Sequence, residues 1–386
     1  MTMATDKQNK VLNVPTLRFP EFTGEWVRNN IFNVAPLQRG FDLPTQDIED
    51  GEYPVVYSNG ILRTHKYYKC EAPGLVTGRS GSIGNFTFIP EGNYWPHNTS
   101  LWVTNFHGND PLFIYYLYQT INISQYATGS GVPTLNRNDV HRHGVSIPLV
   151  PEQRKIAEFL SLIDKRIVTQ NRIIEDLRNL KTYIHNRVFS KANKLYGLRN
   201  TIRLSDIATK ITRKNKGNTI NNVLSNSAAK GIVPQAEVFD KEIANEDNTA
   251  NYYVIENGDF VYNPRKSAQA PFGPINMYKG QAKGIISPLY LCFQVTDINK
   301  NYLLHYFMSN VWYSYIYSNG DTGVRHDRVS IKDETFLNMP LYIHTVDKQQ
   351  EIAKMMDQVD AKIALEELYL TTLQKQKDYL LAAMFV

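Results

Sequence analysis

The chain has 386 residues and a net charge of +5, from 42 Lys and Arg against 37 Asp and Glu. This length predicts two or three domains, each large enough to bury its own core. The two cysteines, Cys70 and Cys292, form no spaced cluster, which argues against a disulfide framework or a zinc site and favours a reducing compartment.

The first fourteen residues are polar and contain no apolar run typical of a signal peptide. The longest apolar stretches are too short to span a bilayer, so we expect a cytoplasmic protein. Residues 1–150 hold 11 Lys and Arg against 12 Asp and Glu, whereas residues 151–200 hold 11 against 5. A protein that binds nucleic acid unaided usually carries a stronger basic stripe, so any DNA binding must depend on local loops or on a partner.

Residues 1–150 predict a first globular domain of the α+β class. A turn, YSNGIL (57–62), precedes an apolar strand that runs into a polar loop, GLVTGRSGSIGNFTFI (74–89). Another strand, SLWVT (100–104), leads to a tyrosine-rich helix, DPLFIYYLYQTI (110–121), and then to a glycine turn, ATGSGVPTLN (127–136). The domain therefore combines short strands, one packed helix and long loops.

The loop GRSGSIG (78–84) raises the question of phosphate binding. It lacks the Lys-Ser/Thr pair of a P-loop and precedes a strand pattern rather than a helix, so a dinucleotide site is not indicated either. A tight turn remains, whose glycines let backbone amides approach a ligand while Arg79, Ser80 and Ser82 point outward. The sequence HRH (141–143) has no companion acids or cysteines at ligand spacing, so solvated histidines are expected there.

Residues 151–192 predict a first long helix, which begins PEQRKIAEFLSLIDKRI. Pro151 suits its first turn. Apolar residues recur at steps of four and three, which is typical of a coiled-coil seam. The seam positions are Ile156, Leu160, Ile163, Ile167, Ile174, Leu177, Ile184 and Val188, with breaks at Gln170 and Lys181.

Residues 193–346 predict a second α+β domain that repeats the order of the first. The corresponding turn is LSNSAAKGIV (224–233), and the strand and polar loop are GDFVYNPRKSAQAPFGPI (258–275). A strand, a tyrosine-rich helix and the glycine turn SNGDTGVRHD (318–327) follow. The polar loop carries side chains able to read base edges or phosphates, namely Asn263, Arg265, Lys266, Ser267 and Gln269.

Residues 347–386 predict a second long helix that repeats the first at an offset of 196 positions, without insertion or deletion. Such an internal repeat dictates the architecture. Asp347 and Gln350 predict a capping box at its start. Its seam positions are Ile352, Met356, Val359, Ile363, Leu370, Leu373, Leu380 and Met384, with breaks at Glu366 and Lys377.

The direction of the two helices follows from their polar breaks. A parallel pair in register would bury Lys181 against Lys377, which is costly. An antiparallel pair places Lys181 near Val359 and Gln170 near Leu370, so that each polar end can reach solvent past an apolar neighbour. We therefore expect two tandem α+β domains separated by two long helices, packed as an antiparallel coiled coil with approximate two-fold symmetry.

No motif indicates catalysis. EIAK and DAK on the second long helix echo the carboxylate-lysine motifs of nucleases, but the polar face of such a helix carries charges in any case. The chain has no Asn-Pro-Pro-Tyr type motif and no glycine signature of the kind that binds S-adenosylmethionine. We expect a protein without catalytic or metal-binding residues.

Taken together, these motifs resemble the specificity subunit of type I restriction-modification systems. The two long helices look like the conserved-region helices of that family. The segments GRSGSIG, NTSLWV, GSGVPTLN and GDFVYNPRKSAQAPFGPI look like the framing motifs of its two target recognition domains. The resemblance implies that residues 1–150 and 193–346 each read one part of a bipartite double-stranded DNA site, while residues 151–192 and 347–386 separate the two parts.

The resemblance also implies the partners. Two methyltransferase subunits would modify adenine with S-adenosylmethionine, and restriction subunits would use ATP and Mg to cut unmethylated DNA, so that this chain itself needs no cofactor. Candidate DNA-binding residues, carried over from the loops of the family, are Arg79, Ser80, Ser82 and Ser130 in the first half and Ser225, Asn226, Lys230, Arg265, Lys266, Ser267 and Arg325 in the second.

Two alternatives remain open on the sequence. One is an enzyme, a DNA methyltransferase or nuclease that acts alone, against which the missing cofactor motif counts. The other is a scaffold that binds only proteins through its coiled coil and has no DNA specificity.

Overall fold

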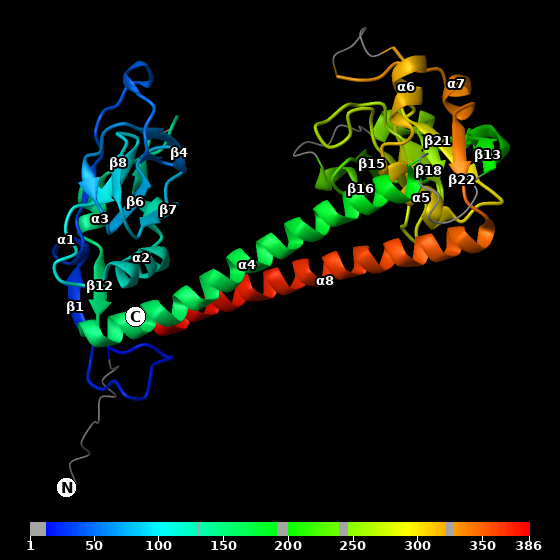
Figure 1. The fold of residues 1–386 in the computed structure, drawn as a ribbon. Helices are drawn as coiled ribbons and strands as arrows, with labels where there is room; N and C mark the ends of the chain where they lie inside the picture. Colours follow the sequence, from blue (N-terminus) through cyan, green and yellow to red (C-terminus); the bar gives the residue numbers. More distant parts are fainter. Residues whose placement is uncertain (1–12, 130, 191–199, 239–245, 322–326) are drawn as a thin grey trace. The chain divides into compact units, whose positions relative to one another are not determined.

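The computed structural model describes residues 13–129, 131–190, 200–238, 246–321 and 327–386. The chain forms two compact units. The first contains residues 1–171 and 368–386, and the second contains residues 172–367. Each unit thus joins one globular domain to part of each long helix (Figure 1), and the units are described one at a time.

In the residues that the structure describes, the globular part of the first unit contains two four-stranded sheets and two two-stranded ribbons, β1-β12 and β10-β11. One sheet has the order β2-β9-β6-β7, and the other has the order β4-β3-β8-β5, in which β3 and β8 run parallel. The strands are β1 (Val27–Asn30), β2 (Leu37–Arg39), β3 (Tyr53–Tyr57), β4 (Gly60–His65), β5 (Cys70–Glu71), β6 (Gly74–Gly78), β7 (Phe86–Ile89), β8 (Asn93–Pro96), β9 (Ser100–Val103), β10 (Ala127–Thr128), β11 (Thr134–Leu135) and β12 (Gly144–Ile147). The short helices are α1 (Ile31–Val34), α2 (Pro111–Thr120) and α3 (Arg137–His141).

The described strands of the second unit repeat the two four-stranded sheets and one of the ribbons, β1-β12, whose counterpart is β13-β22. Its sheets have the orders β14-β21-β18-β19 and β16-β15-β20-β17, and β15 runs parallel to β20. The strands are β13 (Asn200–Arg203), β14 (Ala208–Lys210), β15 (Val223–Ser227), β16 (Gly231–Pro234), β17 (Tyr253–Ile255), β18 (Phe260–Tyr262), β19 (Ile275–Met277), β20 (Gly284–Ile286), β21 (Leu291–Val295) and β22 (Pro340–Ile343). Its short helices are α5 (Lys300–Met308), α6 (Tyr313–Asn319) and α7 (Asp333–Leu337). The prediction of two tandem α+β domains is confirmed.

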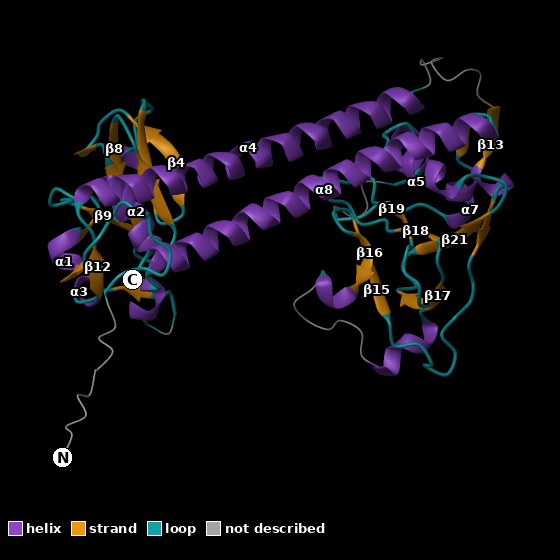
Figure 2. Ribbon diagram, turned by 90° about the horizontal axis from the view of Figure 1, so that it is seen from below, coloured by secondary structure: helices purple, strands orange, loops and turns teal. Residues whose placement is uncertain are grey.

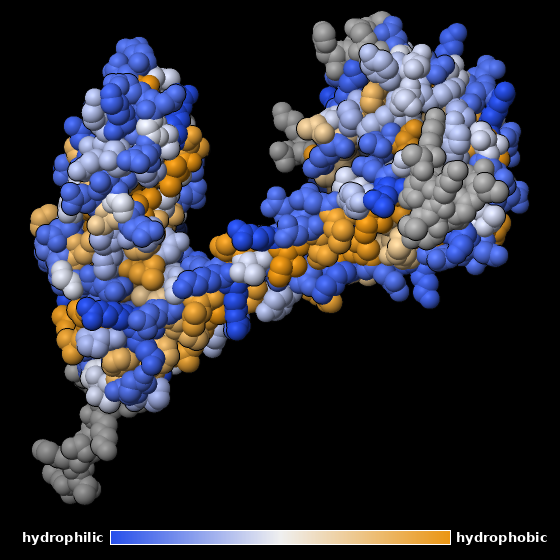
Figure 3. Space-filling model, in the orientation of Figure 1, coloured by the Kyte–Doolittle hydropathy of each residue, from blue (hydrophilic) through white to orange (hydrophobic). Residues whose placement is uncertain are grey.

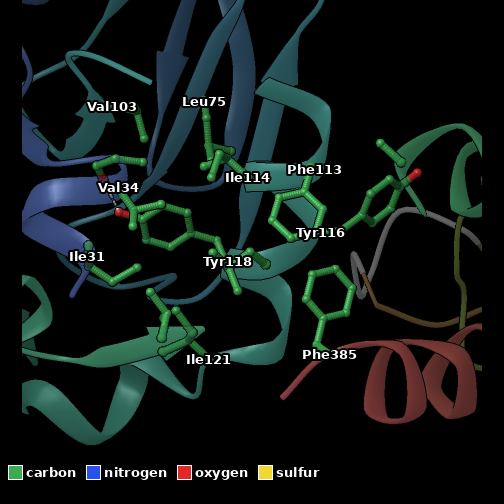
Figure 4. Packing of buried hydrophobic residues seen from close by; sticks show 14 of the residues in the cluster. Ile31, Val34, Leu75, Val103, Phe113, Ile114, Tyr116, Tyr118, Ile121 and Phe385 are labelled. Atoms are coloured by element: carbon green, nitrogen blue, oxygen red, sulfur yellow. Dashed lines mark hydrogen bonds between the residues drawn. The ribbon is translucent and has the colours of Figure 1, made fainter. Parts of the chain in front are cut away.

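The tyrosine-rich helix of each domain forms the centre of its core. In α2 the side chain of Asp110 caps the first turn by accepting a hydrogen bond from the backbone N–H of Phe113. The rings of Phe113, Tyr116 and Tyr118 are buried, and Figure 4 shows Phe113 facing Phe385, which follows the last residue of the second long helix, at a ring distance of 5.2 Å. The end of the chain is therefore part of the first core.

The two long helices are α4 (Val150–Phe189) and α8 (Val346–Met384), and they run antiparallel within each unit (Figure 2). In the first unit Ile156 and Leu160 of α4 share a core with Met384 of α8. In the second unit Val188 of α4 shares a core with Ile352 of α8. The start of one helix thus meets the end of the other, as predicted.

Two details of the predicted helices were wrong. Helix α8 begins at Val346, so Asp347 lies within its first turn and does not cap it. The amine of Lys181 lies beside the residue after Val359, because it forms an ion pair with Asp360 at 2.5 Å, and its side chain is partly exposed. Gln170, the other predicted break, is buried, so the prediction that its polar end reaches solvent was wrong.

A buried glutamine joins each long helix to its domain. Gln153 of α4 accepts a hydrogen bond from the backbone N–H of Asp110 and donates one to the backbone oxygen of Pro148, both at 2.9 Å. Gln349 of α8 makes the equivalent pair of bonds with Asn299 at 3.1 Å and His344 at 2.9 Å. The repeated glutamine therefore fixes the same junction twice.

Within the described ranges, no helix combines the length and the apolar composition that crossing a bilayer requires.

Candidate nucleic-acid interface

Three loops meet at one end of the first domain. The loop after β6 carries Arg79 and Ser80, and Ser80 pairs with Thr134 in an isolated antiparallel bridge. The backbone N–H of Leu135 donates to the oxygen of Arg79 at 2.7 Å. A Cβ atom on Gly78 would lie 2.1 Å from the backbone oxygen of Ser82 and 3.0 Å from that of Ser58, in the β3–β4 turn. Only glycine fits where these segments approach so closely.

The same three loops meet in the second domain. The loop after β18 pairs with the segment before α7 through an antiparallel bridge between Arg265 and Arg328. The backbone N–H of Lys266 donates to the oxygen of Asp327 at 2.8 Å. The end of β15, which leads into the β15–β16 turn, joins them, because the side chain of Asn263 donates to the backbone oxygen of Asn226 at 2.9 Å. Two motifs that are distant in sequence, the polar loop and the glycine turn, are therefore adjacent in both domains.

Several predicted DNA-binding residues lie on these loops. In the first domain Arg79, Ser80 and Ser82 are half-buried. In the second domain Arg265 and Ser267 are exposed and Lys266 is half-buried.

Lys230 is exposed in the adjacent β15–β16 turn, and its amine donates to the backbone oxygen of Glu237 at 2.8 Å. Ser130 and Arg325 lie outside the described residues.

Ser225 and Asn226 differ from the other predicted contacts, because both side chains are buried. The amide of Asn226 donates to the backbone oxygens of Val261 at 2.8 Å and Pro274 at 3.2 Å, and its oxygen accepts a hydrogen bond from Asn276 at 2.7 Å. An amide with all its hydrogen bonds made inside the domain positions the loops around it. We therefore leave both residues out of the contact surface and assign Asn226 a positioning role.

The structure adds residues that the sequence prediction missed. Asn59 is exposed in the turn between β3 and β4, beside the GRSGSIG loop. The pair Asn59-Gly60 is a common signal for a two-residue hairpin turn and marked the position as exposed. Arg328 adds a second arginine beside Arg265, but no sequence pattern indicated that the two segments pair.

The loops of the second domain carry charges of both signs. The pKa of Asp327 lies below its usual value because its carboxylate accepts a hydrogen bond from Arg328, and the charges of Arg328 and Arg265 act in the same direction. The positive charges of both arginines therefore act on one carboxylate. Guanidinium donors pair well with guanine edges and with phosphates, so this arrangement suits an anionic, hydrogen-bonding ligand.

The HRH segment has a structural role. His141 contacts the backbone of Leu37, with 2.9 Å between its Nε2 and the backbone nitrogen, and His143 hydrogen bonds to the hydroxyl of Tyr126 at 2.7 Å. Both rings are half-buried, so the prediction of solvated histidines was wrong. Burial lowers the pKa of both rings. Among the residues that the structure describes, no three His, Cys, Asp or Glu side chains are placed to hold a metal ion.

The comparisons with known proteins identify the repeated unit. The family profile of the type I restriction modification DNA specificity domain matches residues 24–179 and again residues 199–375. The S subunit of the type I restriction-modification system from M. genitalium has a similar structure, with 15% identity, coverage of 97% of this chain and 99% of that chain, and a TM-score of 0.56. A chain from a study of complex assembly and conformational transition of the type I R-M system has 14% identity, coverage of 92% and 96%, and a TM-score of 0.54. No curated protein matches the sequence.

Proposed function

We propose, because the chain belongs to the type I restriction modification DNA specificity family, that it is the DNA-recognition subunit of a type I restriction-modification complex. Each globular domain reads one part of a bipartite DNA target through its three loops. The chain itself is non-catalytic. Methylation of adenine and cleavage of DNA belong to methyltransferase and restriction subunits, which use S-adenosylmethionine, ATP and Mg.

One observation carries this proposal. The same loops, on the same two sheets and in the same order, occur twice in a single chain. A chain with a single active site would not require two copies of the same loops with different polar side chains. Two domains that read different DNA sequences need similar frames that carry different loops.

We further propose that α4 and α8 set the unread gap of the target. Helices of 40 and 39 residues are about 60 Å long at 1.5 Å per residue. Two readers that use the major groove from one face of DNA need centres about 34 Å apart, or a multiple of this distance. A helix pair of this length is long enough to define such a spacing.

The long helices also offer a surface for the partner subunits. Apolar side chains stay exposed along them in each unit (Figure 3). These include Leu162, Val168 and Leu368 in the first unit and Leu180 and Leu365 in the second. Exposed apolar surface of this kind is typical of protein contacts. Because residues 1–150 have no basic excess, methyltransferase subunits bound here would supply much of the grip on the DNA backbone.

The decisive experiment is sequencing of methylated bases in a host with and without this gene. We expect a split motif with methylated adenine that disappears on deletion and returns on complementation. A methylation pattern that is identical in both strains, although the partner subunits are expressed, would reject the proposed function.

A second experiment isolates the role of the helices. Insertion of one matched heptad into both α4 and α8 keeps the antiparallel register and lengthens the pair by about 10 Å. We expect the gap in the methylated motif to lengthen while both half-site sequences stay the same. A changed half-site with an unchanged gap would show that the helices do not measure the spacing.

A further inference from the structure

The second unit contains a cavity of about 450 Å³ with aromatic walls. Its size is within the range of pockets that bind small organic ligands. The tyrosine rings at Tyr253, Tyr262 and Tyr290 contribute to its lining. Pro264, Arg328 and Phe336 complete the part of the wall used in the argument below.

The cavity lies directly beside the predicted DNA-reading loops. Pro264 precedes the exposed Arg265, and its backbone oxygen accepts a hydrogen bond from the N–H of Val329 at 2.9 Å. Val329 and its neighbour Arg328 also line the cavity. The residues that pair the polar loop with the glycine-turn segment are thus the same residues that form one wall of the cavity.

The floor of the cavity is rigid. The ring of Tyr262 stacks on Phe336 with 4.5 Å between ring centres, and its hydroxyl donates to the backbone oxygen of Phe272 at 2.9 Å. Tyr253 and Tyr290 also line the cavity and are half-buried, so part of each side chain is accessible. Rings held in this way provide flat surfaces on which another planar group can stack.

One polar group in the wall is a hydrogen-bond donor without an acceptor. The Nε of Arg328 is buried and has no hydrogen-bond partner in the described structure, whereas its Nη2 contacts Asp327 at 3.3 Å. A buried donor without an acceptor is unfavourable. A ligand with an acceptor on the edge of a planar ring would satisfy it.

The first domain has small side chains at two of these aromatic positions. The pairing of β6 with β9 matches Thr77 with Leu101, and the pairing of β18 with β21 matches Tyr262 with Leu291. Thr77 therefore corresponds to Tyr262, and Ser100 corresponds to Tyr290. Both small side chains are buried in the first domain, so the tyrosines are a property of the second domain and not of the shared frame.

We propose that this cavity binds a nucleobase that the second domain unstacks from its half of the DNA target. The half-buried rings of Tyr253 and Tyr290 stack on the base, and the Nε–H of Arg328 donates to an acceptor on its edge. Because the inference rests on the proposed function, its test uses the complete complex with methyltransferase subunits and a duplex that carries the methylated motif.

The variant Tyr290→Ala removes one wall, Tyr290→Phe keeps the ring, and Arg328→Met removes the donor. Tyr317→Ala, at an exposed tyrosine of α6 in the same unit, is the matched control.

In the first measurement 2-aminopurine replaces each base of the second half-site in turn, except the adenine that is methylated. We expect a several-fold rise in fluorescence on binding at one position, lost in Tyr290→Ala and kept in Tyr290→Phe and Tyr317→Ala.

A second measurement tests whether the cavity contributes to binding through that base. Tyr290→Ala should weaken binding of the intact duplex roughly tenfold and should leave binding of a duplex that lacks this base almost unchanged. Equal weakening of both duplexes would overturn the proposal. Failure of the Tyr290→Ala chain to assemble with methyltransferase subunits in the absence of DNA would also overturn the proposal. The cavity would then hold a side chain of a partner subunit.

A third measurement separates a DNA base from a free nucleotide. Equilibrium dialysis of the complex with nucleosides and nucleoside monophosphates should show no binding that Tyr290→Ala abolishes. Binding of this kind would assign the cavity to a free nucleotide and overturn the proposal. If the unaltered complex shows no sequence preference in DNA binding, the proposed function fails first, and the two failures are therefore distinguishable.

Discussion

Lys181 of α4 forms an ion pair with Asp360 of α8, with 2.5 Å between the amine and a carboxylate oxygen. In the first unit Lys377 forms the equivalent pair with Asp164 at 2.7 Å. Since 181 + 196 = 377 and 164 + 196 = 360, one lysine and one aspartate of the repeated helix pair reciprocally. An antiparallel arrangement satisfies both pairs, whereas a parallel arrangement in register would place the two lysines together.

The variant Asp360→Lys should destabilise the second unit. It replaces an attraction with a repulsion at a partly exposed site, so we expect a loss of about 1 kcal/mol in the free energy of unfolding. The double variant Lys181→Asp/Asp360→Lys should recover most of this loss in urea unfolding. Gln358→Lys, at an exposed position of the same helix, is the control, and a double variant no more stable than Asp360→Lys would contradict the assignment.

Replacement of the buried glutamines should loosen the junction between helix and domain. Gln153→Ala and Gln349→Ala each leave the backbone N–H of a half-buried residue without its acceptor, so each should cost about 1 kcal/mol. Gln153→Ala should act on the first unit and Gln349→Ala on the second, which hydrogen exchange of α2 and α5 would separate. Gln358→Ala should have no effect, and uniform protection in all three variants would refute this role.

The second unit should lose stability in acid. Burial lowers the pKa of His185 to about 3, and the nearby charges of His305 and Lys181 act in the same direction. Burial also lowers the pKa of His305, although its hydrogen bond to Asp357 and the charge of Asp360 oppose this. The unfolded chain binds the proton with a pKa of about 6.5, so the unfolded state holds more protons between pH 6.5 and pH 3 and stability falls as pH falls through this window.

His185→Leu tests this pH dependence, because Leu381 occupies the equivalent position in the other helix. Melting temperatures measured between pH 7 and pH 4 should fall less steeply in this variant than in the unaltered protein. His107→Asn, at an exposed histidine of the first unit, should keep the original slope. An unchanged slope in His185→Leu would exclude the histidine as the source.

Asn226 should affect DNA recognition through the stability of its loops. Asn226→Ala removes hydrogen bonds to Val261, Pro274 and Asn276, so we expect a loss of about 1–3 kcal/mol together with weaker methylation at the second half-site. Arg265→Ala should weaken methylation at the same half-site without loss of stability. If Asn226→Ala leaves the unfolding curve unchanged, the positioning role is wrong.

Arg79 should determine part of the first half-site. A bidentate contact between arginine and a base contributes about 1–3 kcal/mol, so Arg79→Ala should weaken DNA binding roughly tenfold or more and relax the sequence at one position. Sequencing of methylated bases would show this, with the second half-site as internal control. Lys66→Ala, at the end of the β3–β4 hairpin away from its turn, should leave the motif intact. A motif unchanged in Arg79→Ala would remove this residue from the interface.

The sequence predicted the elements that depend on local pattern. The seam of α4 and α8 and the doubled order of loops follow from apolar spacing and repetition, which can be read along the chain. The expectation of an antiparallel pair needed one more physical argument, the cost of two buried lysines. The ion pair of Lys181 was not predicted, because its acid comes from the other helix, 179 positions away.

The sequence by itself therefore determined the architecture of this protein: two copies of one α+β unit and two long helices in opposite directions. Only the tertiary structure decided which polar residues of a motif are exposed. Asn226 and Arg265 looked alike as loop residues, but strand pairing buries the first among backbone carbonyls and leaves the second at the surface. Burial depends on contacts between distant segments, such as Ser80 with Thr134, and no local pattern specifies those contacts.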